Sequence, residues 1–137
     1  MKKKILTALL IAAILTSCKK TIEKIQENAV IKAMTDGQWV VTSFVKNGSV
    51  VTSDFSGYKF QFYSNYTVDA IKNAAVEKSG TWQGDASAMT ITANFSNITE
   101  PLSLLNGVWH IDNNSWTYVV ASQNSGGETK SLRLEKL

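Results

Sequence analysis

The 137-residue sequence is poor in the side chains that usually build metal or redox sites. It has one cysteine and one histidine, so it can close no internal disulfide and has no thiolate or imidazole cluster for a structural zinc. It also has no G-x-S-x-G elbow and no Gly-rich phosphate loop. We therefore expect no catalytic residue, no metal and no cofactor, and an enzyme is the class with the least support.

Long apolar runs are missing as well. The longest, Ile5–Leu15, is about half the length of the roughly 20 residues that a membrane-spanning helix needs. It follows Lys2, Lys3 and Lys4, and small residues come after it. A basic start, a short apolar core and small residues are typical of a signal peptide.

The only cysteine stands where that run ends, in Leu15-Thr16-Ser17-Cys18. This stretch resembles the bacterial lipobox. The resemblance implies that the Cys18 thiol receives a diacylglyceryl group, that cleavage makes Cys18 the first residue, and that its amine takes a further fatty-acyl (palmitate-type) chain. Two or three acyl chains, at roughly 0.8 kcal/mol per buried CH₂, anchor a protein stably. The alternative is an incidental cysteine in a discarded signal.

Net charge disappears when the signal peptide is removed. Loss of Lys2, Lys3 and Lys4 reduces the 14 basic side chains to 11, which equals the 11 acidic ones. A nucleic-acid-binding protein needs a basic surface, so we expect no nucleic-acid partner.

We divide the chain into a signal peptide (1–17), a lipidated tether with an amphipathic helix (18–36) and a β-domain (37–137). In the tether, Ile22, Ile25, Ala29 and Ala33 recur at helical spacing. Three further apolar residues widen this side of the helix: Val30, Ile31 and Met34. They favour a helix that docks on the β-domain over a flexible spacer.

After Gly37, β-branched and aromatic residues dominate, and Gly, Asn, Asp and Ser interrupt them every eight to twelve residues or so. This pattern predicts an all-β antiparallel domain of roughly eight or nine strands, which fits a sandwich or a small barrel. Short turns between consecutive strands favour an up-and-down barrel of about eight strands, preceded by the short helix. Alternation places one set of side chains inside the barrel: Tyr58, Phe60, Phe62, Tyr66, Val68, Ala70, Met89, Ile91, Ala93, Phe95, Trp116, Tyr118, Val120, Leu132 and Leu134.

A Gly-x-Trp tripeptide occurs three times, at residues 37–39, 80–82 and 107–109. One interpretation is that three strands each begin with a glycine turn followed by a core tryptophan. The stretches GQWVVTSF, GYKFQF, GTWQG, LLNGVWHI and LRLEKL also resemble small lipocalin-like lipoproteins of Gram-negative bacteria. That resemblance implies a lipocalin-like barrel in which the only arginine, Arg133, stacks on Trp39; the alternative is a solvated Arg133. The chain lacks the lipocalin T-D-Y motif and disulfide pair.

His110 and Asp112 share one side of a strand without a second histidine or a nucleophile, so we interpret them as a surface pair. Two functions stay open. The first is a lipid-anchored protein that binds a small hydrophobic ligand, the binding activity implied by the lipocalin-like resemblance, against Tyr58, Phe60, Phe62, Tyr66, Trp116 and Tyr118. The second is a structural or interaction module whose barrel core is filled and whose protein partner is unknown. We expect an outer-membrane location on the periplasmic face, with the cell surface as the alternative.

Overall fold

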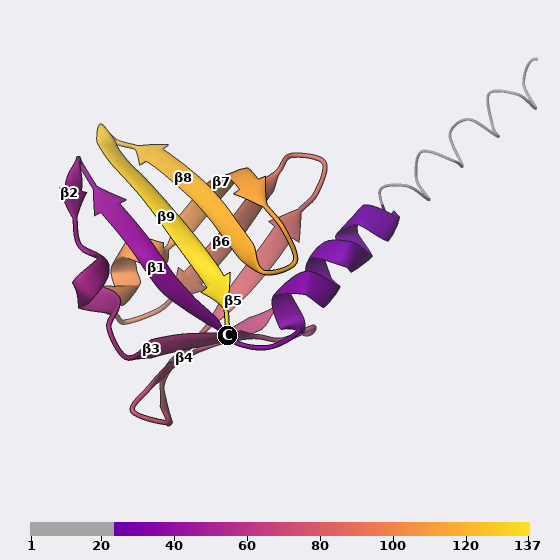
Figure 1. The fold of residues 1–137 in the computed structure, drawn as a ribbon, viewed down its shortest axis with the longest axis horizontal. Helices are drawn as coiled ribbons and strands as arrows, with labels where there is room; N and C mark the ends of the chain where they lie inside the picture. Colours follow the sequence, from indigo (N-terminus) through magenta and orange to yellow (C-terminus); the bar gives the residue numbers. More distant parts are fainter. Residues whose placement is uncertain (1–23) are drawn as a thin grey trace, which may run out of the picture.

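The computed structural model describes residues 24–137 (Figure 1). Cys18, the predicted signal peptide and Ile22 lie outside the described residues. The described part contains a helix over residues 24–35, two 3₁₀ helices and nine strands. Their bounds are β1 (Trp39–Lys46), β2 (Ser49–Val50), η1 (Thr52–Phe55), β3 (Tyr58–Phe62), β4 (Thr67–Lys72), β5 (Ala75–Asp85), β6 (Thr90–Phe95), η2 (Leu102–Leu105), β7 (Gly107–Asn114), β8 (Tyr118–Ser125) and β9 (Glu128–Lys136).

The strands form a single antiparallel sheet that closes on itself. Neighbours in the sheet follow the order of the chain, and β1 also pairs with β9, which completes a barrel of eight strands. The two-residue strand β2 only extends β1 as a short hairpin. The predicted all-β, up-and-down barrel with a preceding helix is therefore confirmed.

The barrel has one weak seam, between β1 and β3. These strands share a single paired position, Trp39 with Phe60, before they separate. Beyond it, the β2–η1 segment supplies the missing partners for β1. The amide of Phe44 donates to Thr52 Oγ1 (2.9 Å), and the amide of Val51 donates to the Phe44 carbonyl (2.9 Å). The backbone at the seam is thus satisfied without a full strand pair.

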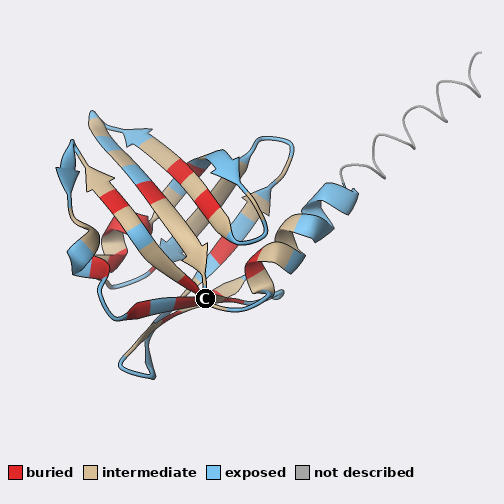
Figure 2. Cartoon of the chain, viewed as in Figure 1, coloured by how far each residue is buried: buried red, intermediate tan, exposed pale blue. Residues whose placement is uncertain are grey.

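Buried residues recur along the strands of the barrel (Figure 2). Most of them are large and apolar, and their side chains form the barrel core. On β3, Tyr58, Phe60 and Phe62 are buried and alternate with more exposed residues, as the period of a strand requires. No polar or charged residue in the described part of the chain is buried. The core is an apolar packing of aromatic rings and aliphatic chains.

The two ends of the barrel are built from different elements. The helix end carries the helix, the β3–β4, β5–β6 and β7–β8 turns and the C-terminus, which lies beside the last turn of the helix (Figure 1). The η end carries η1, η2 and the β1–β2, β4–β5 and β8–β9 turns. Four side chains from the 3₁₀ helices are buried at the η end: Phe55, Leu102, Leu104 and Leu105.

The helix docks on the barrel, as predicted, but only through its C-terminal half. Met34 is buried, and Val30 and Ile31 pack against the core. The expected stripe through Ile25 and Ala29 is exposed instead, so that part of the prediction is wrong. The reason is geometric, because Val30, Ile31 and Met34 form their own stripe at i, i+1 and i+4 and carry more apolar area than the alanines. Within residues 24–137 no helix has the length and apolar character that crossing a membrane requires.

Candidate functional site

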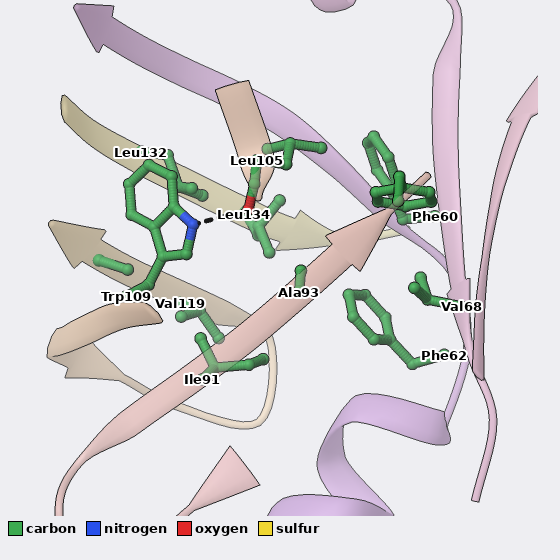
Figure 3. A pocket seen from close by; sticks show the side chains of 12 residues that line it. Phe60, Phe62, Val68, Ile91, Ala93, Leu105, Trp109, Val119, Leu132 and Leu134 are labelled. Atoms are coloured by element: carbon green, nitrogen blue, oxygen red, sulfur yellow. Dashed lines mark hydrogen bonds between the residues drawn. The ribbon is translucent and has the colours of Figure 1, made fainter. Parts of the chain in front are cut away.

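The interior of the barrel contains one small cavity of about 50 Å³ (Figure 3). Its twelve lining residues are all apolar in character, from Phe60 and Phe62 on one side to Trp109 and Leu132 on the other. The two polar atoms drawn there are hydrogen-bonded to each other, because the indole N–H of Trp109 donates to the Leu105 carbonyl (2.8 Å). For comparison, an engineered apolar cavity of about 150 Å³ binds benzene. The interior therefore holds far less than a fatty acid.

A second cavity of about 120 Å³ lies between the helix and the helix end of the barrel. Val30, Ala33 and Met34 form its helix side. Ile91 and Val119 line both this cavity and the interior one, so these two side chains separate the two spaces. A displacement of the helix would open the second cavity to solvent, while Ile91 and Val119 would still lie between solvent and the interior cavity.

Trp39 and Lys136 fix the helix to the barrel. The Trp39 indole N–H donates to the Met34 carbonyl in the last turn of the helix (2.9 Å). Lys136 Nζ lies 5.1 Å from the Trp39 ring centroid and 3.7 Å from Asp36 Oδ2. The partner of Trp39 is thus a lysine.

The predicted stacking of Arg133 on Trp39 is wrong. Arg133 lies on the outer face of β9, where its guanidinium is 4.4 Å from the Tyr118 ring centroid and Nε is 3.3 Å from Glu135 Oε1. Successive residues of a strand point to opposite faces. Lys136 shares the inward face with Leu132 and Leu134, because these residues are two positions apart along the strand. Alternation along β9 could therefore have identified Lys136, and not Arg133, as the inward-facing cation.

The η end repeats the same arrangement. The Trp109 indole N–H donates to the Leu105 carbonyl, and Lys130 Nζ lies 5.5 Å from the Trp109 ring centroid. Lys130 Nζ also donates to the Leu104 carbonyl (3.0 Å). Burial lowers the pKa of Lys130, and the neighbouring Glu128 partly opposes this effect. A tryptophan and a lysine from β9 therefore close each end of the barrel.

The third Gly-x-Trp tripeptide supports the β3–β4 turn. The Trp82 indole N–H donates to the Tyr63 carbonyl (2.9 Å), and the ring meets Phe62 edge-on with centroids 5.5 Å apart. Gly80 is required here because a Cβ would lie 2.4 Å from the Asn94 carbonyl oxygen on the next strand. All three tripeptides thus place a buried, hydrogen-bonded tryptophan, which agrees with their interpretation as core positions.

The six residues predicted to contact a ligand divide into two groups. Tyr58, Phe60 and Phe62 are buried, and Phe60 and Phe62 line the interior cavity. Their contact with a ligand stays a prediction. Tyr66 and Trp116 are 48% and 57% exposed, and Tyr118 is half-buried against Arg133, so their predicted inward orientation is wrong.

The error on β8 comes from a shift of one residue. A bulge between Ile111 and Asn113 changes the register with β7, and Val119 and Ala121 point inward instead of Tyr118 and Val120. Because all four of these β8 residues are apolar, alternation gives no signal here. The sequence pattern therefore did not identify Val119 and Ala121 as core residues. Both are small enough to lie beside the bulky rings that fill the barrel. Met89, also predicted inward, lies in a turn and is exposed.

His110 and Asp112 form an exposed pair, with Nδ1 3.0 Å from Oδ1. A hydrogen bond from Ser122, followed by that of His110, lowers the pKa of Asp112. Across residues 24–137 there is no group of three His, Cys, Asp or Glu side chains that could hold a metal ion. The apolar cavities and the two barrel ends are therefore the candidate functional features of residues 24–137.

Among solved structures, the chain is similar to a DUF4847 family protein from Bacteroides vulgatus ATCC 8482, known at 1.00 Å resolution. The TM-score is 0.53 and the sequence identity 16%, over 77% of this chain and 96% of that chain. At this identity the likeness shows a common fold and carries no activity with it. No protein-family model matches the sequence, and no curated protein matches it.

Proposed function

We propose that this protein is a lipid-anchored, non-enzymatic module of the cell envelope whose filled barrel contacts another envelope component. The small interior volume carries this proposal, because ligand pockets usually measure about 300–1,000 Å³ and the barrel leaves about 50 Å³ free. The lining offers no free polar group that could orient a ligand. A packed apolar core is typical of a rigid scaffold that contacts its partner through its outer surface.

The anchor is the part of the proposal that rests on sequence. Support comes from the basic start, the short apolar run and Leu15-Thr16-Ser17-Cys18. Cells grown with an alkyne fatty acid should label the protein, and a Cys18→Ala variant should be unlabelled and leave the membrane fraction. An unlabelled wild-type protein, or a Cys18→Ala variant that still sediments with membranes, would contradict the anchor. We propose the periplasmic face of the outer membrane as its location.

The non-enzymatic assignment is supported by the exposed position of the one imidazole–carboxylate pair. His110 and Asp112 lie on the outer surface of β7, away from both cavities. A general base needs an enclosed substrate position beside it, and this pair has open solvent.

The cavity beneath the helix favours a second candidate function, the binding of a small hydrophobic ligand. Its volume, about 120 Å³, approaches the size that accepts a benzene-like molecule. Ala33 projects from the helix into its lining, so Ala33→Leu should fill part of the space. Native mass spectrometry with benzene-sized apolar compounds should then detect binding to the wild type and not to Ala33→Leu. A panel without any bound mass leaves the filled module as the function.

A further inference from the structure

Exposed apolar side chains are concentrated at one end of the molecule. Six of the nine large hydrophobic residues exposed in the described part of the chain belong to the helix end: Ile25, Tyr63, Tyr66, Met89, Trp116 and Leu137. The other three are valines, Val50, Val76 and Val108, which sit in strands where β-branched residues are ordinary. Every exposed tryptophan, tyrosine and methionine side chain among residues 24–137 is therefore at the helix end.

Two of these residues occupy backbone positions that bulky side chains avoid. Tyr66 has φ 67° and Met89 has φ 55°. The other non-glycine residues with positive φ are three asparagines and one alanine, and none of them is bulky. A large residue in the left-handed region costs free energy and persists where its side chain has a use. Met89 faces solvent in the β5–β6 turn. Tyr66, 48% exposed in the β3–β4 turn, presents one part of its ring to solvent and packs with its ring centroid 6.0 Å from that of Trp82.

The helix that follows the predicted anchor in the sequence docks on the same side. The helix begins by residue 24 and docks at the helix end through Val30, Ile31 and Met34. Cys18 precedes Lys24 by six residues, which can span at most roughly 20 Å when extended. An acylated Cys18 would therefore keep this end of the barrel close to the membrane surface.

We propose that the helix end lies against the bilayer, with Trp116, Tyr66 and Met89 in the headgroup region. This inference rests on the lipid anchor of the proposed function. Tryptophan and tyrosine are favoured at membrane interfaces because each joins an apolar ring to a polar group. The charged side chains of the helix and its surroundings balance, with Lys24, Lys32 and Lys136 against Glu27, Asp36 and Asp85, so net charge at this end gives no attraction to anionic lipid. The η end then faces away from the membrane.

Trp116 supplies the probe for a direct test. It is the exposed member of the four tryptophans, because Trp39, Trp82 and Trp109 are at most 2% exposed. The full acylated protein is reconstituted in vesicles of phosphatidylethanolamine and phosphatidylglycerol, and quenching by iodide is compared with that of the soluble Cys18→Ala variant. We expect iodide quenching to fall at least threefold in vesicles, and lipids brominated near the headgroup to quench the same fluorescence. Trp116→Phe should remove both effects.

A second variant separates membrane contact from folding. Tyr66→Asn with Met89→Asn removes two apolar side chains and places in both turns a residue that tolerates positive φ. Stability should change little, because the relief at positive φ offsets the lost contact between Tyr66 and Trp82, whereas iodide access to Trp116 in vesicles should increase. Val108→Asn, an exposed position outside the helix end, is the matched control and should leave the access unchanged.

Each contrary outcome has its own meaning. A protein that floats with the vesicles while Trp116 stays as accessible as in solution overturns the membrane-facing orientation and leaves the anchor intact. A wild-type protein that does not float with vesicles overturns the anchor itself. Protection of Trp116 in native envelope fragments but not in pure lipid vesicles would assign this surface to a protein partner and overturn the lipid assignment.

Discussion

At the η end of the barrel, buried side chains of the 3₁₀ helices close the core. At the helix end, the N-terminal helix covers the core and packs against it only through its last two turns. Both ends use a tryptophan with a lysine from β9 above its ring. At the η end, Phe55 and the buried leucines of η2 complete the seal. At the helix end, a cavity of about 120 Å³ remains beneath the helix. Similar closing residues thus give one end that is filled with buried side chains and one end that keeps a cavity beneath its covering helix.

The largest contrast should come from truncating one buried side chain at each end. Phe55→Ala removes a ring stacked 4.9 Å from Phe44 in a sealed region and should cost about 3–5 kcal/mol of unfolding free energy. Met34→Ala should cost about 2 kcal/mol or less, because the helix can undock while the barrel stays folded. Urea unfolding measures both values. Hydrogen exchange over residues 30–36 should accelerate in Met34→Ala alone.

Equal losses in the two variants, with exchange unchanged over the helix, would contradict this contrast. The helix would then belong to the same cooperative unit as the barrel.

Two glycines of β5 offer a matched pair of alanine substitutions. In Gly80→Ala the new Cβ would lie 2.4 Å from the Asn94 carbonyl oxygen, a backbone atom that can shift only with its strand. In Gly84→Ala it would lie 2.9 Å from Val30 Cγ1, a side-chain atom of the movable helix. We expect a loss of about 3 kcal/mol for Gly80→Ala and about 1 kcal/mol for Gly84→Ala.

Thermal unfolding followed by circular dichroism checks the order of the two glycine variants. Gly84→Ala should also expose the helix to faster hydrogen exchange and leave the strands unchanged. A Gly84→Ala protein as unstable as Gly80→Ala would mean that the helix cannot move away from β5.

The β-barrel itself could be predicted from the sequence because its signal is repeated. Alternation on β3 and β6 and the pair Leu132 and Leu134 on β9 each point to the same inward face, and the turns between strands are marked by Gly, Asn and Ser. Each of the three Gly-x-Trp tripeptides adds a buried ring. Agreement among many short segments outweighs the ambiguity of any one of them.

The details at the helix end could not be predicted for physical reasons. On β8 four successive apolar residues hide the alternation, and the bulge in β7 that sets their register has no sequence mark. Trp116 and Tyr66 were expected inside because the alternation was extended beyond the strands, whereas β8 begins at Tyr118 and β4 at Thr67, so both residues lie in turns. Their exposure depends on turn geometry. In our proposal it also depends on contact with a membrane, which no intrachain pattern in the sequence indicates.

The two lysines that lie over the tryptophan rings should differ in their contribution to the free energy of unfolding. Lys136→Met should lower stability by about 0.5–1 kcal/mol, because it removes the cation–π contact with Trp39, while the pair with the exposed Asp36 adds little. Lys130→Met should change stability by less than about 0.5 kcal/mol. Its lost contacts are offset by relief of the desolvation that lowers the pKa of Lys130.

Chemical denaturation at pH 7 measures both lysine variants. A marked loss in Lys130→Met, larger than that of Lys136→Met, would show that the charge at the η end is a net stabilising feature.

Two tyrosines, one from each end, should titrate late for different reasons. At the η end, burial raises the pKa of Tyr58 to about 12, with a further contribution from Glu77. At the helix end, a hydrogen bond to Asp69 raises the pKa of Tyr63. Because both pKa values are raised, the stabilisation is complete below about pH 10, the value of a free tyrosine, and is lost as the pH rises through the folded-state values.

Absorbance at 295 nm during an alkaline titration distinguishes the two causes. Asp69→Asn should return the Tyr63 step towards the ordinary pKa and leave the step near pH 12 unchanged, because that step depends on the packing of β3. Tyr58→Phe should remove the late step. If Asp69→Asn instead moves the late step, the pKa of Tyr58 at the η end depends on surface charge as much as the pKa of Tyr63 does. The two ends would then not differ in how they set the pKa of their tyrosines.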